Sequence, residues 1–556
     1  MHWSLKHEAR GHRMLYPLLK EQSHHALKCK SRATTMSISW LLFFLCRERH
    51  FRGTMGGNMD FLDPKKMRWH TIRLLVGYVL VAFAILLATT LLILYAYGFR
   101  LNRDGELNQK GLVFFSSLPS GAELYIDGNR KDTTNVKLNL VSGTYHFVIR
   151  REGYTDWQRT VRVDGGSVEH YVYPMLFPQE ITPTELTMYD TVPVLSTQSP
   201  DKRWLVIQST RGDSFLVYDL NRGQADIAQA TAIDVPATLL TESATPATWE
   251  VLEWSTNNRH FLAKRTFTVN DKKQFEYVLV DRQRPEGSHN LSEELGVTPD
   301  KLTLRDKKPD QYYVYDGTKN TLSRASLGSP TPQVFLQNVL GYASHGDDMV
   351  LYATNEGADE SRAVVRLREQ SRTYDIRTID ESDVYLLDLA RYDGKWYMII
   401  GSQAEDRVYL YEDPVAQLRR NSSGSAIIGF AFTIDNPTRV SFSANAQFIM
   451  VQNGAQAHVY DVDDNQAWRY KFPYPVEGPE TYATWMDGHR LSYVSGGRQV
   501  VVEYDNANRR ELSESDKRHG GFYDRNSEYL YTFTPREDGE PGLALSATPL
   551  RTPADL

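Results

Sequence analysis

The residues of this chain that could carry chemistry are eight histidines after residue 100 and the serines that could serve as nucleophiles. A serine hydrolase would hold its nucleophile in a Gly-x-Ser-x-Gly turn, and the sequence has none; Ser344, which His345 and Gly346 follow, lacks the leading glycine. The histidines stand singly, with neither a His-Glu-x-x-His motif nor a close pair that would predict a zinc site. A metal site of the lyase type, assembled from histidines of distant segments, stays open. The histidines are His146, His170, His260, His289, His345, His458, His489 and His519.

An acidic run at residues 461–465 invites comparison with a calcium-binding loop, because closely spaced carboxylates are ligands that Ca²⁺ prefers. The helix-loop-helix pattern is not met, since Gln466 stands where the loop needs glycine and Phe472 where it needs the closing glutamate. A solvated turn between two strands is predicted instead. The sequence therefore predicts no catalytic residue, no metal ligand and no cofactor.

Aromatic rings offer a second kind of binding chemistry. Four tryptophans lie at or near predicted turns, where an exposed ring could stack on a sugar. The competing interpretation, packing between neighbouring repeats, is favoured. The four are Trp254, Trp396, Trp468 and Trp485.

The composition narrows the class of protein. A net charge of −6 spread over 556 residues argues against a nucleic-acid partner, which would call for a basic patch. The two cysteines, Cys29 and Cys46, both precede residue 74, so the rest of the chain has neither a disulfide nor a thiol nucleophile. Many tyrosines and frequent turn residues favour β-structure.

The elements that would position any site begin with an uncharged segment, residues 74–99, which is long enough to cross a bilayer as a helix. Positive residues are in excess on its amino-terminal side, within a basic segment at 59–73. This asymmetry predicts a cytoplasmic amino terminus and an extracytoplasmic body in the cell membrane. The cations before the segment are Lys65, Lys66, Arg68 and Arg73, whereas Arg100 and Arg103 after it are offset by Asp104 and Glu106.

The segments beside the helix carry few structural signals. Residues 1–58 are expected to be a disordered cytoplasmic tail, and residues 100–110 a short linker. Translation from Met55 or Met59 is a hypothesis, because the sequence from Met59 onward is similar to the opening of a bacterial membrane anchor.

From Gly111 the pattern changes to short alternating strands separated by glycine-containing turns, which predicts a small β-sandwich over 111–176. The segment PSGAELYIDG, followed by SGTYHFVIRREGY, resembles a PEGA domain. The resemblance implies a surface module without catalytic residues, here acting as a spacer. The matching residues, which we interpret as folding determinants, are Pro119, Gly121, Ala122, Gly128, Gly143, Tyr145, Gly153 and Tyr154.

A repeat then fills residues 199–550, before a tail at 551–556. It follows a proline-containing linker at 177–198, which could also donate a strand to the repeat. Each unit contains a polar turn, an aromatic or aliphatic strand, a second turn and another strand. The spacing predicts propeller blades, seven or eight in number, and the units resemble Tol-system and WD40-like repeats. The units are 199–220, 255–282, 305–327, 344–369, 391–413, 443–463, 486–506 and 524–550.

The sequence thus predicts an all-β extracytoplasmic body, a small sandwich plus a propeller, on a single transmembrane helix. The expected function is non-enzymatic binding of an envelope component, a cell-wall polysaccharide or a partner protein. The alternatives are a propeller enzyme such as a polysaccharide lyase, with its site in the central channel, and a scaffold of an envelope export or division complex. Three or more convergent His, Asp, Glu or Arg side chains in the channel would favour the enzyme, and a tyrosine-lined or plugged channel would favour binding.

Overall fold

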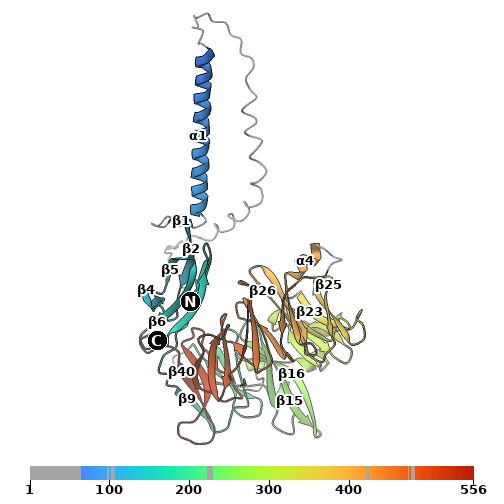
Figure 1. The fold of residues 1–556 in the computed structure, drawn as a ribbon. Helices are drawn as coiled ribbons and strands as arrows, with labels where there is room; N and C mark the ends of the chain where they lie inside the picture. Colours follow the sequence, from blue (N-terminus) through green and yellow to red (C-terminus); the bar gives the residue numbers. More distant parts are fainter. Residues whose placement is uncertain are drawn as a thin grey trace, which may run out of the picture. The chain divides into compact units, whose positions relative to one another are not determined.

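The computed structural model describes residues 64–96, 99–101, 107–221, 229–347, 349–420, 425–473, 475–476 and 482–555 (Figure 1). The chain divides into two units, Met1–Leu91 and Leu92–Leu556, which we take separately. The tail expected at 1–58 and the start of the basic segment lie outside the described residues.

Helix α1, Pro64–Ala96, lies mostly in the first unit. Its stretch Thr71–Ile93 has a mean hydropathy of 2.5 and is long and apolar enough to cross a membrane. The hydroxyls of Thr89 and Thr90 donate to the carbonyls four residues earlier, so these polar groups are satisfied within the helix. The helix ends earlier than the expected 74–99, because Phe99 already pairs with Gln109 in a β-ladder.

The second unit opens with a β-sandwich of two four-stranded sheets. One sheet has the order β1-β2-β5 with β8 parallel to β2, and the other has the order β4-β3-β6-β7. Inward-facing side chains such as Phe115, Phe147 and Trp157 fill the space between them and are almost fully buried. The strands are β1 Phe99–Leu101, β2 Leu107–Phe115, β3 Glu123–Ile126, β4 Asn129–Thr133, β5 Val136–Val141, β6 Gly143–Arg150, β7 Trp157–Val163 and β8 Val168–Tyr171.

The rest of the unit, residues 184–550, is called the repeat region here. It contains eight four-stranded antiparallel sheets, numbered sheet 1 to sheet 8 in chain order, and each predicted repeat unit supplies the two middle strands of one sheet. The strands of sheets 1 to 4 are β10 Leu195–Gln198, β11 Trp204–Gln208, β12 Ser214–Asp219, β13 Thr231–Asp234; β14 Thr248–Trp254, β15 His260–Val269, β16 Lys272–Asp281, β17 His289–Asn290; β18 Lys301–Leu304, β19 Gln311–Asp316, β20 Thr321–Ser326, β21 Ser329–Leu336; β22 Gly341–His345, β23 Met349–Thr354, β24 Arg362–Glu369 and β25 Arg372–Asp380.

The strands of sheets 5 to 8 are β26 Tyr385–Tyr392, β27 Lys395–Ser402, β28 Arg407–Glu412, β29 Ile428–Thr433; β30 Arg439–Phe442, β31 Phe448–Gln452, β32 Gln456–Asp461, β33 Gln466–Lys471; β34 Thr484–Trp485, β35 Arg490–Ser495, β36 Arg498–Glu503, β37 Arg510–Glu514; and β38 Phe522–Tyr523, β39 Tyr529–Pro535, β40 Leu543–Pro549 with β9 Thr184–Tyr189. Short helices in the connections are η1 Ala237–Leu239, η2 Pro285–Gly287, α3 Leu291–Leu295, η3 Arg305–Lys307 and α4 Pro414–Arg420.

Sheet 8 joins the two ends of the repeat region. Its outer strand β9 comes from before sheet 1 and pairs with β40, and Figure 1 shows the two labels together. The segment 177–198 is therefore more than a linker, because it contains β9 and β10.

Apolar clusters connect the sheets in sequence. Within β23, Leu351 packs toward sheet 5 and Val350 toward sheet 3, so this strand is buried along its whole length. One such cluster joins each sheet to the next, from sheet 1 to sheet 8, and another joins sheet 8 back to sheet 1. Each sheet thus has both faces covered by its neighbours.

Candidate functional site

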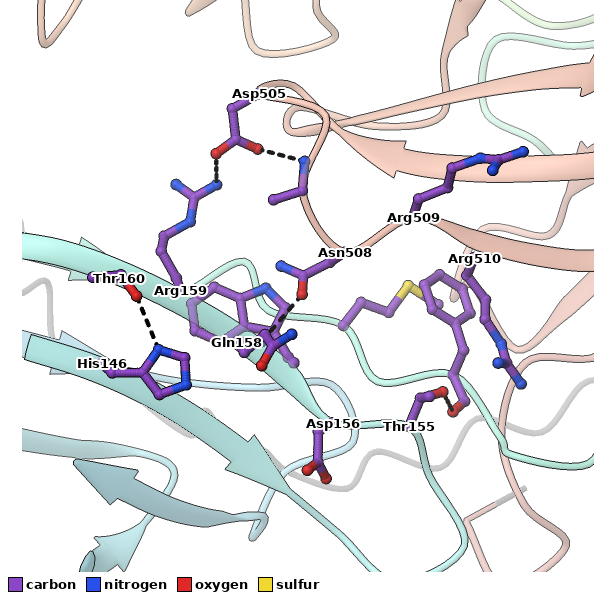
Figure 2. A pocket seen from close by; sticks show the side chains of 14 residues that line it. His146, Thr155, Asp156, Gln158, Arg159, Thr160, Asp505, Asn508, Arg509 and Arg510 are labelled. Carbon is purple, nitrogen blue, oxygen red and sulfur yellow. Dashed lines mark hydrogen bonds and ion pairs between the residues drawn. The ribbon is translucent and has the colours of Figure 1, made fainter. Parts of the chain in front are cut away.

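The sandwich and sheet 7 meet at a cavity of about 610 Å³, which Figure 2 shows from close by. Strand β7 lines one side, and the turn between β36 and β37 lines the other. The backbone N–H of Gln158 donates to Oδ1 of Asn508 across this boundary at 3.1 Å. The cavity marks a joint between two parts of one unit.

A buried ion-pair network fixes this joint. The guanidinium of Arg159, with a side chain only 9% exposed, pairs with Glu503 at 3.1 Å and also with Asp505. Nε1 of Trp157 donates to Oε1 of Glu503 at 2.5 Å. Burial raises the pKa of Glu503, and the nearby Arg159 opposes that shift. Tyr173 of the sandwich stacks on the ring of His489 at 4.4 Å between centroids, so apolar contacts surround the charges.

The joint occupies one face of the repeat region. Because successive strands of each sheet are antiparallel, the turns after the first and third strands lie at one face, and the remaining connections lie at the opposite face. His489 follows the first strand of sheet 7, and Asp505 follows its third strand. The sandwich therefore contacts the first of these faces, at sheets 7 and 8, and leaves the second free.

The free face contains a larger cavity of about 880 Å³, which we call the axial pocket. Its wall includes residues of the first strands β10, β14, β30, β34 and β38, and of the connections that precede them. The first strands of several successive sheets lie side by side, so they surround a common axis. Five of the eight sheets thus contribute to one pocket.

The charged groups of this pocket are mostly positive. Its lining contains four cationic side chains and one carboxylate, Glu250. Arg518 pairs with Asp516 at 2.8 Å, and the guanidinium of Arg439 lies 4.9 Å from the ring centroid of Tyr482. The two remaining cations, both exposed, are Arg211 and Lys517.

Buried polar groups complete the pocket wall. Gln208 is fully buried, and its Nε2 donates to the carbonyl of Gly212 at 2.7 Å. The side-chain oxygens of Gln208 and Gln499 have no hydrogen-bond partner within the described part of the chain. Both ring nitrogens of His519 form hydrogen bonds, one with the hydroxyl of Ser196 at 2.7 Å and one with the carbonyl of Pro193 at 3.0 Å. Burial lowers the pKa of His519.

The four tryptophans singled out from the sequence lie in packing positions. Trp254 is buried against Phe261, and its Nε1 donates to Thr197 of sheet 1 at 3.0 Å. Trp396, Trp468 and Trp485 are half-buried against the clusters between sheets 4 and 5 and between sheets 6 and 7. None of the four lines the axial pocket. A role in stacking on a ligand stays a prediction.

The residues of the PEGA-like motif lie in the sandwich, away from the axial pocket. Gly121, Gly128 and Gly153 adopt φ of +74°, +77° and +79°, which glycine permits without strain at these turns. Tyr154 belongs to the buried core, and its hydroxyl donates to Asp555 at 2.8 Å. The other motif residues are Pro119 before the first of these turns, the buried Ala122, Gly143 at the start of β6 and the half-buried Tyr145 in β6.

The remaining histidines are dispersed, and the described residues contain no group of three His, Cys, Asp or Glu side chains that could hold a metal ion. The acidic run at 461–465 forms the turn between β32 and β33, where the buried Asp461 accepts from the backbone N–H of Asp463 at 2.9 Å.

Comparison with known proteins identifies the sandwich. Residues 110–173 match the family model of the PEGA domain. No curated protein matches the chain.

Solved structures with a similar arrangement of sheets share little sequence with the chain. Hsv2p of Kluyveromyces lactis is 10% identical, with a TM-score of 0.33 over 64% of this chain and 97% of that chain. An oligogalacturonate lyase in complex with manganese is 10% identical, with a TM-score of 0.35 over 67% and 97%. Dihydro-heme d1 dehydrogenase NirN in complex with DHE is 12% identical, with a TM-score of 0.37 over 58% and 67%. These values are too low to carry an argument about function.

Proposed function

We propose that the chain is a membrane-anchored binding protein whose repeat region is an eight-bladed propeller held on the PEGA-like sandwich. The main support for this proposal is the position of the sandwich on the repeat region. It is fixed through Arg159 and Glu503 to one face of the repeat region, and the axial pocket opens on the other. The sandwich then acts as a spacer, and the pocket face is left to a ligand or partner.

The blade count rests on the sheets and their contacts. Eight sheets follow one another, apolar clusters link consecutive sheets, and β9 completes sheet 8. Closure of such a ring protects strand edges that would otherwise pair with other chains.

The orientation in the cell membrane rests on the charges beside α1. The excess of positive residues before the helix favours a cytoplasmic amino terminus, with the sandwich and repeat region outside the cell membrane. A protease added to intact cells should then cleave the segment after Arg100. If cleavage required lysis, the proposed orientation would be wrong.

The binding role can be tested by an affinity-capture experiment. Full-length protein in detergent micelles is incubated with cell-envelope fractions, before and after glycan digestion, and bound material is identified. Retention of a glycan or of a discrete envelope protein supports the proposal. If the protein retains no more material than a control with detergent alone, the proposal is refuted.

An enzyme is the second candidate, because Arg, Glu and His side chains converge at the axial pocket as the criterion for an enzyme requires. It ranks second because Arg518 is paired with Asp516 and both ring nitrogens of His519 are already used in the pocket wall. Glu250 is the carboxylate of its described lining that could accept a proton, since His519 uses both ring nitrogens. The test incubates the full chain with acidic and neutral polysaccharides and follows release of shorter or unsaturated products. Product that disappears in Glu250→Gln would support the enzyme, and absence of product from every substrate would leave the binding role.

A further inference from the structure

Two features of the axial pocket indicate which chemical groups its ligand should carry. Arg211 and Lys517 are exposed and form no ion pair within the described residues, so they favour a negative charge. The side-chain oxygen of Gln208 in the same wall is an acceptor without a donor. Buried acceptors are nearly always paired in folded proteins, so this one indicates a missing donor.

A second repeat shows that an amide at this position can be paired by the chain itself. Gln208 ends the second strand of sheet 1, and Gln452 ends the second strand of sheet 6; both are fully buried. Nε2 of Gln452 donates to the carbonyl of Ala483, and its oxygen accepts from the N–H of Ala483, both at 2.9 Å. The amide at this position can therefore be satisfied at both ends by the chain, and in sheet 1 it is not.

The turn that carries Arg211 is held in place by its neighbours. The carbonyl of Gly212 accepts from Gln208 and from Nε1 of Trp249, both at 2.7 Å. Asp213 pairs with the buried Arg265 of sheet 2 at 2.7 Å. A fixed backbone lowers the entropy lost when the side chain of Arg211 binds a ligand.

We propose that the axial pocket binds an acidic saccharide, a sugar ring that carries a carboxylate beside free hydroxyls. The carboxylate accepts hydrogen bonds from Arg211 and Lys517, and a hydroxyl donates to the oxygen of Gln208. A neutral sugar would leave the cations without partners. An acidic peptide would supply carboxylates, and its only donors toward the buried oxygen would be backbone N–H groups, so it is the competing ligand in the experiment.

The size of the pocket agrees with a short oligosaccharide. Its volume of about 880 Å³ lies within the roughly 300–1,000 Å³ range of small-molecule sites. Hydroxyl side chains in the wall, including Thr248 and Thr484, add further hydrogen-bonding groups. This inference rests on the proposed binding role and names the ligand class for it.

The experiment measures binding of oligogalacturonate to the full-length protein in detergent micelles by titration calorimetry. The matched probes are neutral oligogalactose and a short poly-glutamate peptide. We expect oligogalacturonate to bind, with affinity that falls as salt is added, and neither matched probe to bind comparably. Comparable binding of oligogalactose, or stronger binding of poly-glutamate, would overturn the proposal.

Three variants locate the site. Arg211→Gln and Lys517→Gln each remove one exposed cation of the pocket and should weaken binding about tenfold, as loss of a charge-assisted hydrogen bond does. Lys273→Gln removes an exposed cation of β16 that lies outside the pocket lining, and should leave binding unchanged. Equal effects of all three variants would overturn the proposal.

The absence of saccharide binding would also distinguish between the two proposals. If the protein binds no acidic saccharide while it still captures an envelope protein from membrane fractions, the ligand class is wrong and the binding role stands. If it captures nothing, both fail.

Discussion

Substitution of Arg159 by glutamine tests whether the sandwich is rigidly fixed to the repeat region. Arg159 and Glu503 have side chains 9% and 3% exposed, so the variant leaves a buried carboxylate without its cation. Breaking a buried ion pair from one side costs about 3–5 kcal/mol. Burial already raises the pKa of Glu503, and loss of Arg159 shifts it further toward the protonated form, so we expect a cost at the lower end of this range, about 3 kcal/mol.

The assay is hydrogen exchange of the full-length protein in micelles, followed at β7 and at the turn between β36 and β37. Arg159→Gln should speed exchange at both segments together, since both lose the same contact. Arg162→Gln is the matched control, because Arg162 lies on the same strand and its pair with Asp164 is 74% and 66% exposed, where ion pairs contribute little.

Restoring neutrality gives a second control. The double variant Arg159→Gln with Glu503→Gln should recover much of the loss, because Glu503 is then no longer a buried charge without its cation. Asp505, which also loses Arg159, is more exposed, at 15%, and keeps the hydrogen bond from the N–H of Ala507. If Arg159→Gln changes exchange no more than Arg162→Gln does, the network does not hold the joint and the reasoning is wrong.

Three further predictions concern the fold. Burial raises the pKa of Asp388, on the innermost strand of sheet 5, to about 6, above its value of about 3.9 when unfolded, so its ionisation destabilises the fold as the pH rises through 6. Asp388→Asn should raise the free energy of unfolding by about 3 kcal/mol near pH 7.5 and leave it unchanged near pH 4, and a gain at both pH values would contradict this. In Gly542→Ala the new Cβ would lie 2.0 Å from a backbone oxygen of β9 at a φ of +119°, so denaturant unfolding should show a loss of about 3 kcal/mol, whereas Gly539→Ala, with open space around it, should cost about 1 kcal/mol. Tyr154→Phe removes the hydroxyl that accepts from the N–H of Thr552 and donates to Asp555, and should speed hydrogen exchange at Thr552, whereas Tyr145→Phe, whose hydroxyl donates within the sandwich, should not.

The repeat could be predicted from the sequence because the two middle strands of each sheet are apolar and end at polar turns. The outer strands were less visible: β21, Ser329–Leu336, is largely exposed and contains Pro330 and Pro332, which read as turn residues. The segment 177–198 was recognised as a linker that could donate a strand, but the partner of β9 could not be predicted, because β40 lies at the far end of the repeat region.

The axial pocket could not be predicted, because its wall is assembled from five sheets that are far apart in the sequence. One signal was available: Gln208 and Gln452 each end an otherwise apolar strand, WLVIQ and FIMVQ, where a polar residue must find a partner or a role. The tryptophans were a weaker guide, since large rings serve equally well to fill the space between sheets.

The pairing of β9 with β40 sets a condition on biosynthesis. Strand β9 leaves the ribosome before any sheet of the repeat region, and its partner β40 belongs to the last of these sheets. Contacts between such distant segments form late, so the nascent chain carries an unpaired strand edge during most of the synthesis of the repeat region. A product that stops short of β40 would keep this edge open and should be a target for chaperones, proteases and aggregation.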